Sequence, residues 1–259
     1  MLLSAGGHAL EYVWYGPSPN DAATLVFLHE GLGCVSAWRD FPERVAEATG
    51  CGVLVYSRAG YGNSDPVTLP RPINFMHDEA LITLPMVIEA TGVREHIIVG
   101  HSDGGSIALI YAAEGQKGEL RGVVLEAPHL FVEDSSLASI RRLTEHYREG
   151  PLRVALERHH GQNADCAFLG WTSIWLDPAF RSWNIEQSLP RINVPVLVIQ
   201  GEDDEYGTLR QVDSIEGGCG APVRSVILPS CGHSPHRDQP HRTLEEITSF
   251  INRTLTQTP

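Results

Sequence analysis

The sequence predicts an α/β fold with a mostly parallel central sheet that is covered by helices on both faces. Short, nearly continuous apolar runs alternate along the chain with segments of helical length, which is the pattern of βα units. A chain of 259 residues is also long enough to bury the core of one such domain. The predicted strands are residues 24–29, 52–57, 96–100, 122–126, 194–200 and 223–228.

Amphipathic segments lie between these runs and supply the crossover connections that parallel strands require. The predicted helices are residues 36–49, 75–91, 102–114, 208–217 and 240–255. Ahead of the first strand, the run HALEYVWYG at residues 8–16 is rich in residue types that favour strands. We expect it to pair with the first residues of the chain as an antiparallel hairpin at the edge of the sheet.

One long interval, residues 128–190, contains no run typical of a buried strand. A structureless loop of this length is uncommon in a compact domain, and the stretches SSLASIRRLTEHYREG and PLRVALERHHG have helical patterns. We therefore predict an α/β core of residues 1–127 and 191–259 with a helical cap insertion of residues 128–190. The cap is expected to cover the carboxyl edge of the sheet.

The charge balance disfavours nucleic acids and anionic membranes as partners. The chain has 19 Lys and Arg against 32 Asp and Glu, a formal net charge of −13, which repels phosphate groups. Residues 1–16 lack the basic and apolar regions of a signal peptide, and no apolar run approaches the roughly 18 residues of a membrane span. We therefore expect a cytoplasmic protein without a membrane segment.

The five cysteines are odd in number and scattered, with no C-x-x-C spacing, so they indicate neither a complete disulfide framework nor a zinc site. The pair His159 and His160, with Asp165 and Cys166 nearby, has spacing too irregular for a typical metal site. We predict no metal and no organic cofactor.

The stretch VGHSDGG, residues 99–105, carries the strongest chemical signal. A predicted strand ends at Gly100 and a predicted helix begins at Ser102, so the G-x-S-x-G pattern lies in the strand–turn–helix setting of a nucleophile elbow. The glycines at positions 100 and 104 permit a turn so sharp that side chains would collide with backbone. The start of the helix also favours negative charge that develops beside the serine.

A serine hydroxyl needs a base, and that base needs a group to orient it. The run VPVLVIQGEDDEYG places Glu202, Asp203 and Asp204 directly after a predicted strand, where each is a candidate. The run LPSCGHSPHRDQP places His233 after the last strand and before a helix. The order serine, acid, histidine is the one that G-x-S-x-G hydrolases use.

From about residue 26 onward, these features together resemble the α/β-hydrolase superfamily. The family commonly shows a strand, a glycine, two variable residues and the acid, and this pattern selects Asp204, with Asp203 and then Glu202 as alternatives. His233 resembles the family's Gly-His histidine. The run YSRAGYGNS, residues 56–64, resembles the family loop D-x-R-G-x-G-x-S and departs from it at residues 57–60.

The resemblance also implies two backbone donors for the oxyanion of a tetrahedral intermediate. The loop after the first central strand reads His29-Glu30-Gly31-Leu32-Gly33, and alignment with relatives selects the N–H of Gly31, with Leu32 as the alternative. The second donor is the N–H of Asp103. Glu30 stands where relatives have glycine, and its carboxylate would raise the barrier unless it is neutralised. We expect Arg58 to pair with it.

The sequence therefore predicts a serine hydrolase that cleaves a carboxylic ester, or a related acyl bond such as an amide, of a small molecule. The resemblance leaves a carbon–carbon hydrolase, an enol-lactonase and an iminopeptidase-type aminopeptidase as alternatives. A hydrolase-like ligand receptor with slow turnover is an alternative of a different class. The oligomeric state stays open, and a homodimer is one of the assemblies that the sequence allows.

Two interpretations of the Asp103 side chain stay open. Negative charge at a helix start is favourable by about 0.3–1 kcal/mol, which is a structural role. Alternatively, GHSDGG resembles the elbow of valacyclovirase-like amino-acid-ester hydrolases, in which the equivalent aspartate recognises a substrate amine. Trp175 and Trp183 in the cap are candidate contacts for an apolar acyl or alcohol group. His29 and His101 border strands and are interpreted as packing residues.

Overall fold

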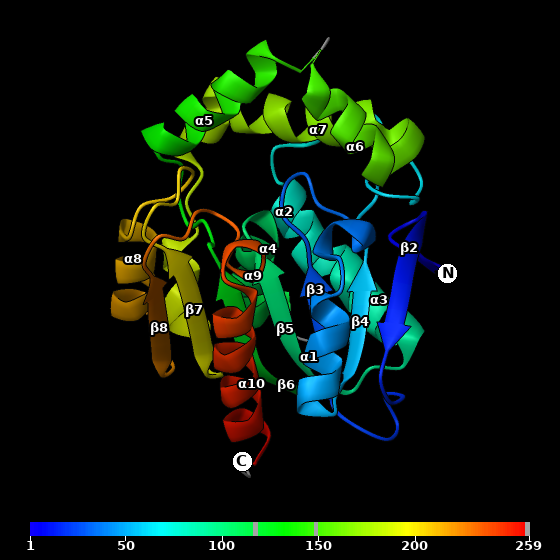
Figure 1. The fold of residues 1–259 in the computed structure, drawn as a ribbon, viewed down its shortest axis with the longest axis vertical. Helices are drawn as coiled ribbons and strands as arrows, with labels where there is room; N and C mark the ends of the chain where they lie inside the picture. The colour runs from blue at the N-terminus through cyan, green and yellow to red at the C-terminus, as the bar shows by residue number, and fades with distance from the viewer. Residues whose placement is uncertain (116–118, 148–149, 257–259) are drawn as a thin grey trace.

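The computed structural model describes residues 1–115, 119–147 and 150–256. Its centre is an eight-stranded sheet in the order β1-β2-β4-β3-β5-β6-β7-β8 (Figure 1). The pairs β1–β2 and β2–β4 are antiparallel, whereas all the other neighbours are parallel. The strands are β1 Leu2–Ala5, β2 His8–Tyr15, β3 Thr24–Leu28, β4 Gly52–Tyr56, β5 Glu95–His101, β6 Glu119–Glu126, β7 Val196–Gly201 and β8 Val223–Leu228. The predicted strands and the edge hairpin are confirmed.

Alternation along each central strand divides the core into two layers. In β3, Leu25 and Phe27 face the layer that contains α1 and α10, and Val26 and Leu28 face the opposite layer. One face of the sheet is covered by α1 Phe41–Thr49 and α10 Pro240–Thr256. The other face is covered by α2 Phe75–Asp78, α3 Leu84–Thr91, α4 Asp103–Ile110 and α8 Arg210–Gly218. Apolar residues on both faces explain why the strands read as continuous apolar runs.

Three predicted helices are shorter or less regular than expected. The segment predicted at 36–49 divides into the 3₁₀ helix η1 Val35–Trp38 and α1, because Arg39 between them has a φ of 56°. The segment predicted at 75–91 contains the π-helical turn η2 Glu79–Thr83 before α3. Pro85 in α3 has no N–H to donate to a preceding carbonyl, so a regular α-helix cannot continue through it. Helix α4 likewise ends in a π-helical turn, η3 Tyr111–Gly115.

The chain between β6 and β7, residues 127–195, is called the β6–β7 segment here. It contains α5 Asp134–Glu145, α6 Pro151–His160, α7 Ala164–Trp175 and the 3₁₀ helices η4 Gly161–Asn163, η5 Pro178–Ser182 and η6 Glu186–Arg191. Figure 1 shows α5, α6 and α7 lying across the carboxyl ends of the parallel strands. Within the segment, an antiparallel bridge joins Phe131 to Asn184.

None of the helices in the described ranges combines the length and the apolarity needed to cross a membrane.

Candidate active site

The turn that carries Ser102 is tightly constrained. Ser102 alone connects β5 to α4, with φ 52° and ψ −116°, a region that residues with side chains rarely adopt. A Cβ atom on Gly100 would lie 2.3 Å from the carbonyl oxygen of Gly104, and one on Gly104 would lie 2.1 Å from that of Leu28. Both positions therefore require glycine, for the steric reason that the sequence indicated.

Ser102, His233 and Asp204 form one hydrogen-bonded chain. Ser102 Oγ lies 2.9 Å from Nε2 of His233. Nδ1 of His233 lies 2.9 Å from Oδ1 and 2.8 Å from Oδ2 of Asp204. The three residues follow β5, β8 and β7, whose carboxyl ends meet at the same edge of the sheet. Chemically, this arrangement can remove the proton from a serine hydroxyl as its oxygen attacks a carbonyl carbon.

The backbone after β7 decides which acidic residue faces His233. The N–H groups of Glu202 and Asp203 donate to the carbonyl oxygens of Leu228 and Cys231. These bonds hold the first two acidic residues along the end of β8, and both remain exposed. The side chain of Asp204 turns inward and is only 1% exposed. Of the three candidates, only Asp204 contacts the histidine.

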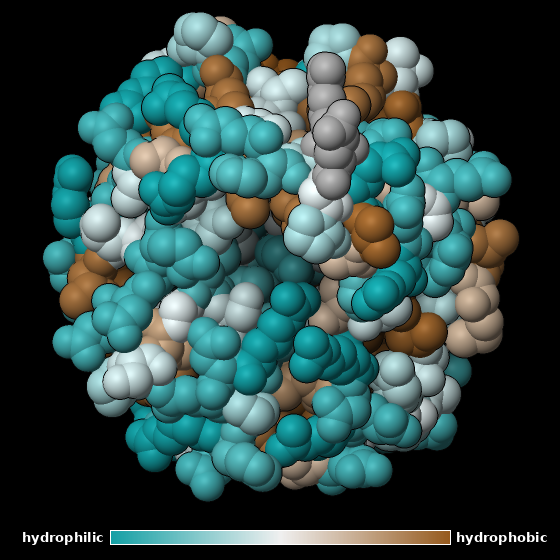
Figure 2. All heavy atoms as spheres, turned by 45° about the horizontal axis from the view of Figure 1, so that its top comes forward, coloured by the Kyte–Doolittle hydropathy of each residue, from teal (hydrophilic) through white to brown (hydrophobic). Residues whose placement is uncertain are grey.

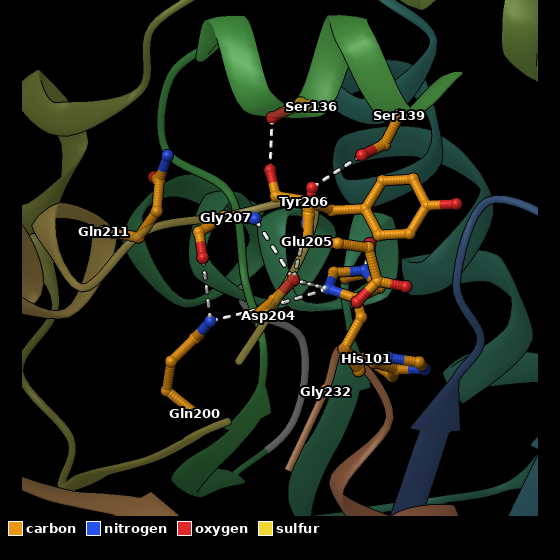
Figure 3. A network of polar contacts seen from close by, with 12 residues as sticks. His101, Ser136, Ser139, Gln200, Asp204, Glu205, Tyr206, Gly207, Gln211 and Gly232 are labelled. Atoms are coloured by element: carbon orange, nitrogen blue, oxygen red, sulfur yellow. Dashed lines mark hydrogen bonds and ion pairs between the residues drawn. The ribbon is translucent and has the colours of Figure 1, made fainter. Parts of the chain in front are cut away.

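The Asp204 carboxylate accepts further hydrogen bonds (Figure 3). Oδ1 accepts from the N–H groups of Tyr206 at 2.7 Å and Gly207 at 3.2 Å, and Oδ2 accepts from Nε2 of Gln200 at 2.6 Å. Burial alone would raise the pKa of Asp204, but the hydrogen bond and charge of His233, together with the Tyr206 N–H, lower it. Asp204 is therefore held as a carboxylate whose acceptor positions are occupied.

Helix α5 holds the loop that carries Asp204. The hydroxyl of Ser136 donates to the carbonyl oxygen of Tyr206, and that of Ser139 donates to the carbonyl oxygen of Glu205 at 2.7 Å (Figure 3). These serines are three residues apart on one helix and therefore point to the same side. The position of the β6–β7 segment is thus linked directly to the loop that orients His233.

Gly31 and Asp103, the expected oxyanion donors, line the same cavity as Ser102. Asp103 is the first residue of α4, so its N–H has no acceptor within the helix. A Cβ atom on Gly31 would lie 2.1 Å from Nε1 of Trp171. Gly31 is therefore glycine because the indole of α7 packs directly against its backbone.

The expected pairing of Glu30 with Arg58 is wrong. Arg58 is buried under the loop and donates instead to the backbone carbonyls of His29 at 2.5 Å and Glu30 at 3.1 Å. The Glu30 carboxylate lies 3.4 Å from the guanidinium of Arg237 and 3.5 Å from Nδ1 of His101. The guanidinium of Arg58 thus bonds to backbone carbonyls, and the Glu30 carboxylate faces Arg237 and His101 instead.

A cavity of about 240 Å³ lies over Ser102 and His233, and Figure 2 shows the molecule hollowed near the middle of the face in view. Trp175 lines this cavity, whereas Trp183 is not among the described residues that line it. Trp183 stacks on Phe180 instead, with ring centroids 5.3 Å apart. The lining residues are Glu30, Gly31, Leu32, Ser102, Asp103, His129, Ser136, Ile140, Leu143, Leu152, Trp171, Trp175, Tyr206, His233 and Arg237.

The side chain of Asp103 is buried in this cavity and only half satisfied. Oδ1 accepts from Nε1 of Trp175 at 3.1 Å, but Oδ2 has no hydrogen-bond partner among the described residues. Burial raises the pKa of Asp103 to about 6, against the opposing effects of the Arg58 charge and the Trp175 hydrogen bond. A buried carboxylate with an open oxygen is costly, which a helix-start role alone does not explain.

His129 and Tyr206 are among the lining residues that sequence reasoning did not single out. The ring centroid of His129 lies 5.5 Å from that of His233, and burial together with the His233 charge lowers the pKa of His129 to about 3. A histidine shortly after a predicted central strand was the available signal, because strand ends meet at the site. Tyr206 had no comparable signal, since its position depends on how the loop that carries Asp204 packs.

Two other buried histidines, His29 and His160, make structural contacts. His29 accepts from the N–H of Arg58 through Nε2 at 3.1 Å. His160 accepts from the N–H of Gly62 through Nδ1 at 3.0 Å and donates to the carbonyl oxygen of Leu32 through Nε2 at 3.0 Å. In the described part of the chain, no three His, Cys, Asp or Glu side chains gather so that they could hold a metal ion.

Comparison with known proteins places this geometry in a family. One curated relative is a 2-succinyl-6-hydroxy-2,4-cyclohexadiene-1-carboxylate synthase of Serratia proteamaculans (strain 568), 25% identical over 89% of this chain and 94% of the relative. The fold matches a carboxylesterase of Nitrososphaera gargenis with a TM-score of 0.78 at 18% identity, over 100% of both chains. It also matches the proline iminopeptidase of Mycobacterium smegmatis with a TM-score of 0.70 at 20% identity, over 98% of both chains.

A family model described as the alpha/beta hydrolase family matches residues 25–246, a span that contains Ser102, Asp204 and His233. The chain therefore belongs to the alpha/beta hydrolase family.

Proposed function

We propose that this protein is a serine hydrolase that cleaves a carboxylic ester of a small molecule through an acyl-enzyme intermediate. The observation that carries the proposal is the hydrogen-bonded chain of Ser102, His233 and Asp204, of which Ser102 and His233 line a cavity. Nucleophile, base and orienting carboxylate each have a partner at hydrogen-bond distance, as nucleophilic catalysis by serine requires. Nucleophilic catalysis by serine requires no metal ion.

In the proposed reaction, Ser102 Oγ bonds to the ester carbonyl carbon while its proton passes to Nε2 of His233. Asp204 holds the resulting imidazolium by its Nδ1 proton. The tetrahedral oxyanion accepts from the N–H groups of Gly31 and Asp103. The C–O bond then breaks, and the leaving alcohol takes the proton from His233. Water, deprotonated by His233, attacks the acyl-enzyme, releases the acid and restores Ser102.

The size and shape of the cavity support a small substrate. A volume of about 240 Å³ lies below the range of roughly 300–1,000 Å³ that is usual for ligand pockets. Trp171 and Trp175 of α7 and the apolar side chains of α5 form much of its wall. We propose that residues 128–190 act as the cap that sets this volume.

The charge of the cavity argues against the reaction named for the Serratia relative. That name describes a carboxylate product, whereas the charged lining residues here are Glu30, Asp103 and Arg237, with Arg237 already beside Glu30. A substrate or product with carboxylate groups would lie in a cavity that is lined by Glu30 and Asp103. A neutral or cationic substrate fits this lining better, which favours ester hydrolysis in this chain.

We further propose that Asp103 recognises an amine on the substrate. Its Oδ2 atom is buried without a partner beside the nucleophile, so an ammonium group would supply the missing donor. A charge-assisted hydrogen bond of this kind contributes on the order of 1.5–3 kcal/mol. The substrate class would then be an ester whose acyl group carries a free amine, which agrees with the elbow resemblance.

The experiment that tests the proposed function is turnover of short p-nitrophenyl esters by wild type and the Ser102→Ala variant. We expect the substitution to lower kcat/KM by about 10⁴-fold or more, with an unchanged melting temperature. A phosphonylating reagent should add one label per chain, and the label should map to Ser102. Turnover retained by folded Ser102→Ala protein would reject the mechanism. No turnover of any ester, lactone, amide or carbon–carbon substrate by wild type would favour a ligand receptor.

The amine proposal is tested with matched pairs of amino-acyl and des-amino esters. Wild type should prefer the amino-acyl ester by about 10- to 100-fold in kcat/KM, corresponding to the energy of one charged hydrogen bond. Asp103→Asn should remove most of this preference, whereas the exposed control Asp203→Asn should keep it. Equal preference in wild type and Asp103→Asn would return Asp103 to the helix-start role.

A further inference from the structure

His101 lies where three loops of the site meet. It directly precedes Ser102 and is fully buried. Its Nε2 atom lies 2.7 Å from the backbone carbonyl oxygen of His233. Its Nδ1 atom lies 3.5 Å from Oε2 of Glu30, in the loop that leads to Gly31. One imidazole ring thus faces the nucleophile turn, the loop of the base and the oxyanion loop.

Both neighbours of the ring are hydrogen-bond acceptors. A backbone carbonyl only accepts, so Nε2 of His101 carries a proton. A neutral ring would then direct the lone pair of Nδ1 at the Glu30 carboxylate, which is repulsive. A second proton on Nδ1 removes the repulsion and forms an imidazolium–carboxylate pair. At 3.5 Å the contact is too long for a strong hydrogen bond, so its attraction is mainly between charges.

The charges around the pair agree with this assignment. Arg237 lies 3.4 Å from the other Glu30 oxygen and favours its ionised form. The pKa of His101 is raised, because Glu30 and then Glu126 outweigh the effect of burial. The pKa of Glu30 is well below its usual value, because His101 and Arg237 outweigh burial in the same way.

Two further histidines lie against the His101 ring. The ring centroids of His233 and His236 are 5.3 Å and 5.1 Å from that of His101. His236 pairs with Glu126 through Nδ1 at 2.8 Å. Because Glu126 is paired with His236, Glu30 is the carboxylate that lies against Nδ1 of His101 among the described residues.

The pair matters because Glu30 precedes Gly31, the proposed oxyanion donor. An unpaired carboxylate here would oppose the negative charge that develops on the substrate oxygen. We propose that His101 is a positioning residue, which as an imidazolium neutralises Glu30 beside the oxyanion loop and holds the backbone of His233. This inference rests on the proposed hydrolase function and adds to it a buried ion pair that links the base loop to the oxyanion loop.

The first arm of the test is a double-mutant cycle. In His101→Gln the amide still donates to the His233 carbonyl but leaves Glu30 with Arg237 as its one remaining cationic neighbour, and we expect kcat to fall about 100-fold with little change in KM. Glu30→Gln removes the charge itself and should cost less than about tenfold. The double variant should recover to within about threefold of Glu30→Gln, because the charges are coupled.

Recovery separates the charge role from a packing role. If His101 only fills space, the two substitutions add, and a double variant no more active than His101→Gln overturns the proposal. His96 is the matched control, because it is a buried histidine at the other end of β5, bonded to the carbonyl of Arg94 and the hydroxyl of Tyr111. Glu30→Gln should give no recovery in a His96→Gln background.

The second arm needs no turnover, so it stays decisive if His101→Gln does not fold or if no ester is hydrolysed. Nitrogen NMR of labelled histidine in Ser102→Ala protein reports how many protons the His101 ring carries. We expect both nitrogens to be protonated at pH 7, and one to lose its proton in Glu30→Gln at the same pH. A singly protonated His101 ring at pH 7 beside intact Glu30 overturns the proposal.

Discussion

Asp204 and Asp103 are both buried carboxylates beside the Ser102–His233 pair, but their surroundings differ. Asp204 accepts from His233, Tyr206, Gly207 and Gln200, and its pKa is lowered. Asp103 accepts one hydrogen bond and has one open oxygen, and burial raises its pKa. A carboxylate whose acceptors are all occupied is fixed in one role. A carboxylate with an open acceptor is destabilised until a ligand supplies a donor.

The largest expected effect comes from the satisfied carboxylate. Asp204→Asn should lower kcat by about 10³- to 10⁴-fold, because an amide cannot hold the imidazolium as a carboxylate does. The matched control is Asp203→Asn, one residue earlier and exposed, which should stay near wild type. Ester hydrolysis rates measured with folded variants decide the assignment. Reversal of the two results would move the orienting role to Asp203.

The next effect concerns Gly31, the proposed oxyanion donor that lines the cavity together with Asp103. Gly31→Ala would place a Cβ atom 2.1 Å from Nε1 of Trp171, so the oxyanion loop or the indole must move. We expect kcat to fall about 10²- to 10³-fold, the usual loss for one oxyanion donor. Gly217→Ala, where nothing lies within 4 Å of the new Cβ, is the control. Unchanged kcat in Gly31→Ala would remove Gly31 from the proposed pair of donors.

The partly unpaired carboxylate of Asp103 should lower the free energy of unfolding, by an amount that depends on pH. The pKa of Asp103 is about 6 in the folded protein against 3.8 ordinarily. Well below pH 3.8 the carboxyl is protonated in both the folded and the unfolded state, so Asp103 contributes no difference there. As pH rises from about 4 to 6, the unfolded chain loses the proton first, and the free energy of unfolding falls by on the order of 2 kcal/mol.

Asp103→Asn mimics the protonated form and should therefore stabilise the protein above pH 6. We expect a melting temperature roughly 5 °C above wild type at pH 7.5 and little difference at pH 4. Thermal unfolding at the two pH values is the measurement, with Asp203→Asn as the exposed control. An equal shift at both pH values would show that the gain does not come from the charge of Asp103.

The smallest expected effect concerns the single hydrogen bond that the Asp103 carboxylate accepts. Trp175→Phe removes the N–H that bonds Oδ1, so the pKa of Asp103 should rise further. The preference for amino-acyl esters should then fall about three- to tenfold at pH 6.5 and recover at higher pH. Trp183→Phe is the matched control, because the indole N–H of Trp183 has no partner among the described residues. Equal effects of the two substitutions would contradict the link through Trp175.

The fold and the Ser102–His233–Asp204 geometry followed from local constraints that the sequence displays. Strands buried on both faces read as apolar runs, and the glycines at 100 and 104 are needed wherever that turn occurs. The choice of Asp204 over its acidic neighbours came from the family pattern. Its physical cause, backbone pairing of Glu202 and Asp203 with the end of β8, depends on strand order.

Predictions of individual side-chain contacts were less successful, because these contacts depend on tertiary packing. Both Trp175 and Trp183 lie in the predicted cap, but Trp175 at the end of α7 lines the cavity, whereas Trp183 follows η5 and stacks on Phe180. Arg58 was a plausible partner for Glu30 in the sequence, but its guanidinium donates to the backbone carbonyls of His29 and Glu30 instead. His101 was interpreted as a packing residue, because nothing in VGHSDGG shows that two acceptors would face its ring.

The bridge between Phe131 and Asn184 holds two positions of the β6–β7 segment, 53 residues apart in the sequence, side by side. Just beside it, the N–H of Ile185 donates to the carbonyl oxygen of Leu130 at 2.8 Å, so the part of the segment from residue 131 to residue 184 begins and ends at adjacent points. Insertions with adjacent ends are tolerated by the host fold. The segment is therefore suited to exchange between relatives as a cassette, with Ser136 and Ser139 retained so that the transplanted helices still hold the loop of Asp204.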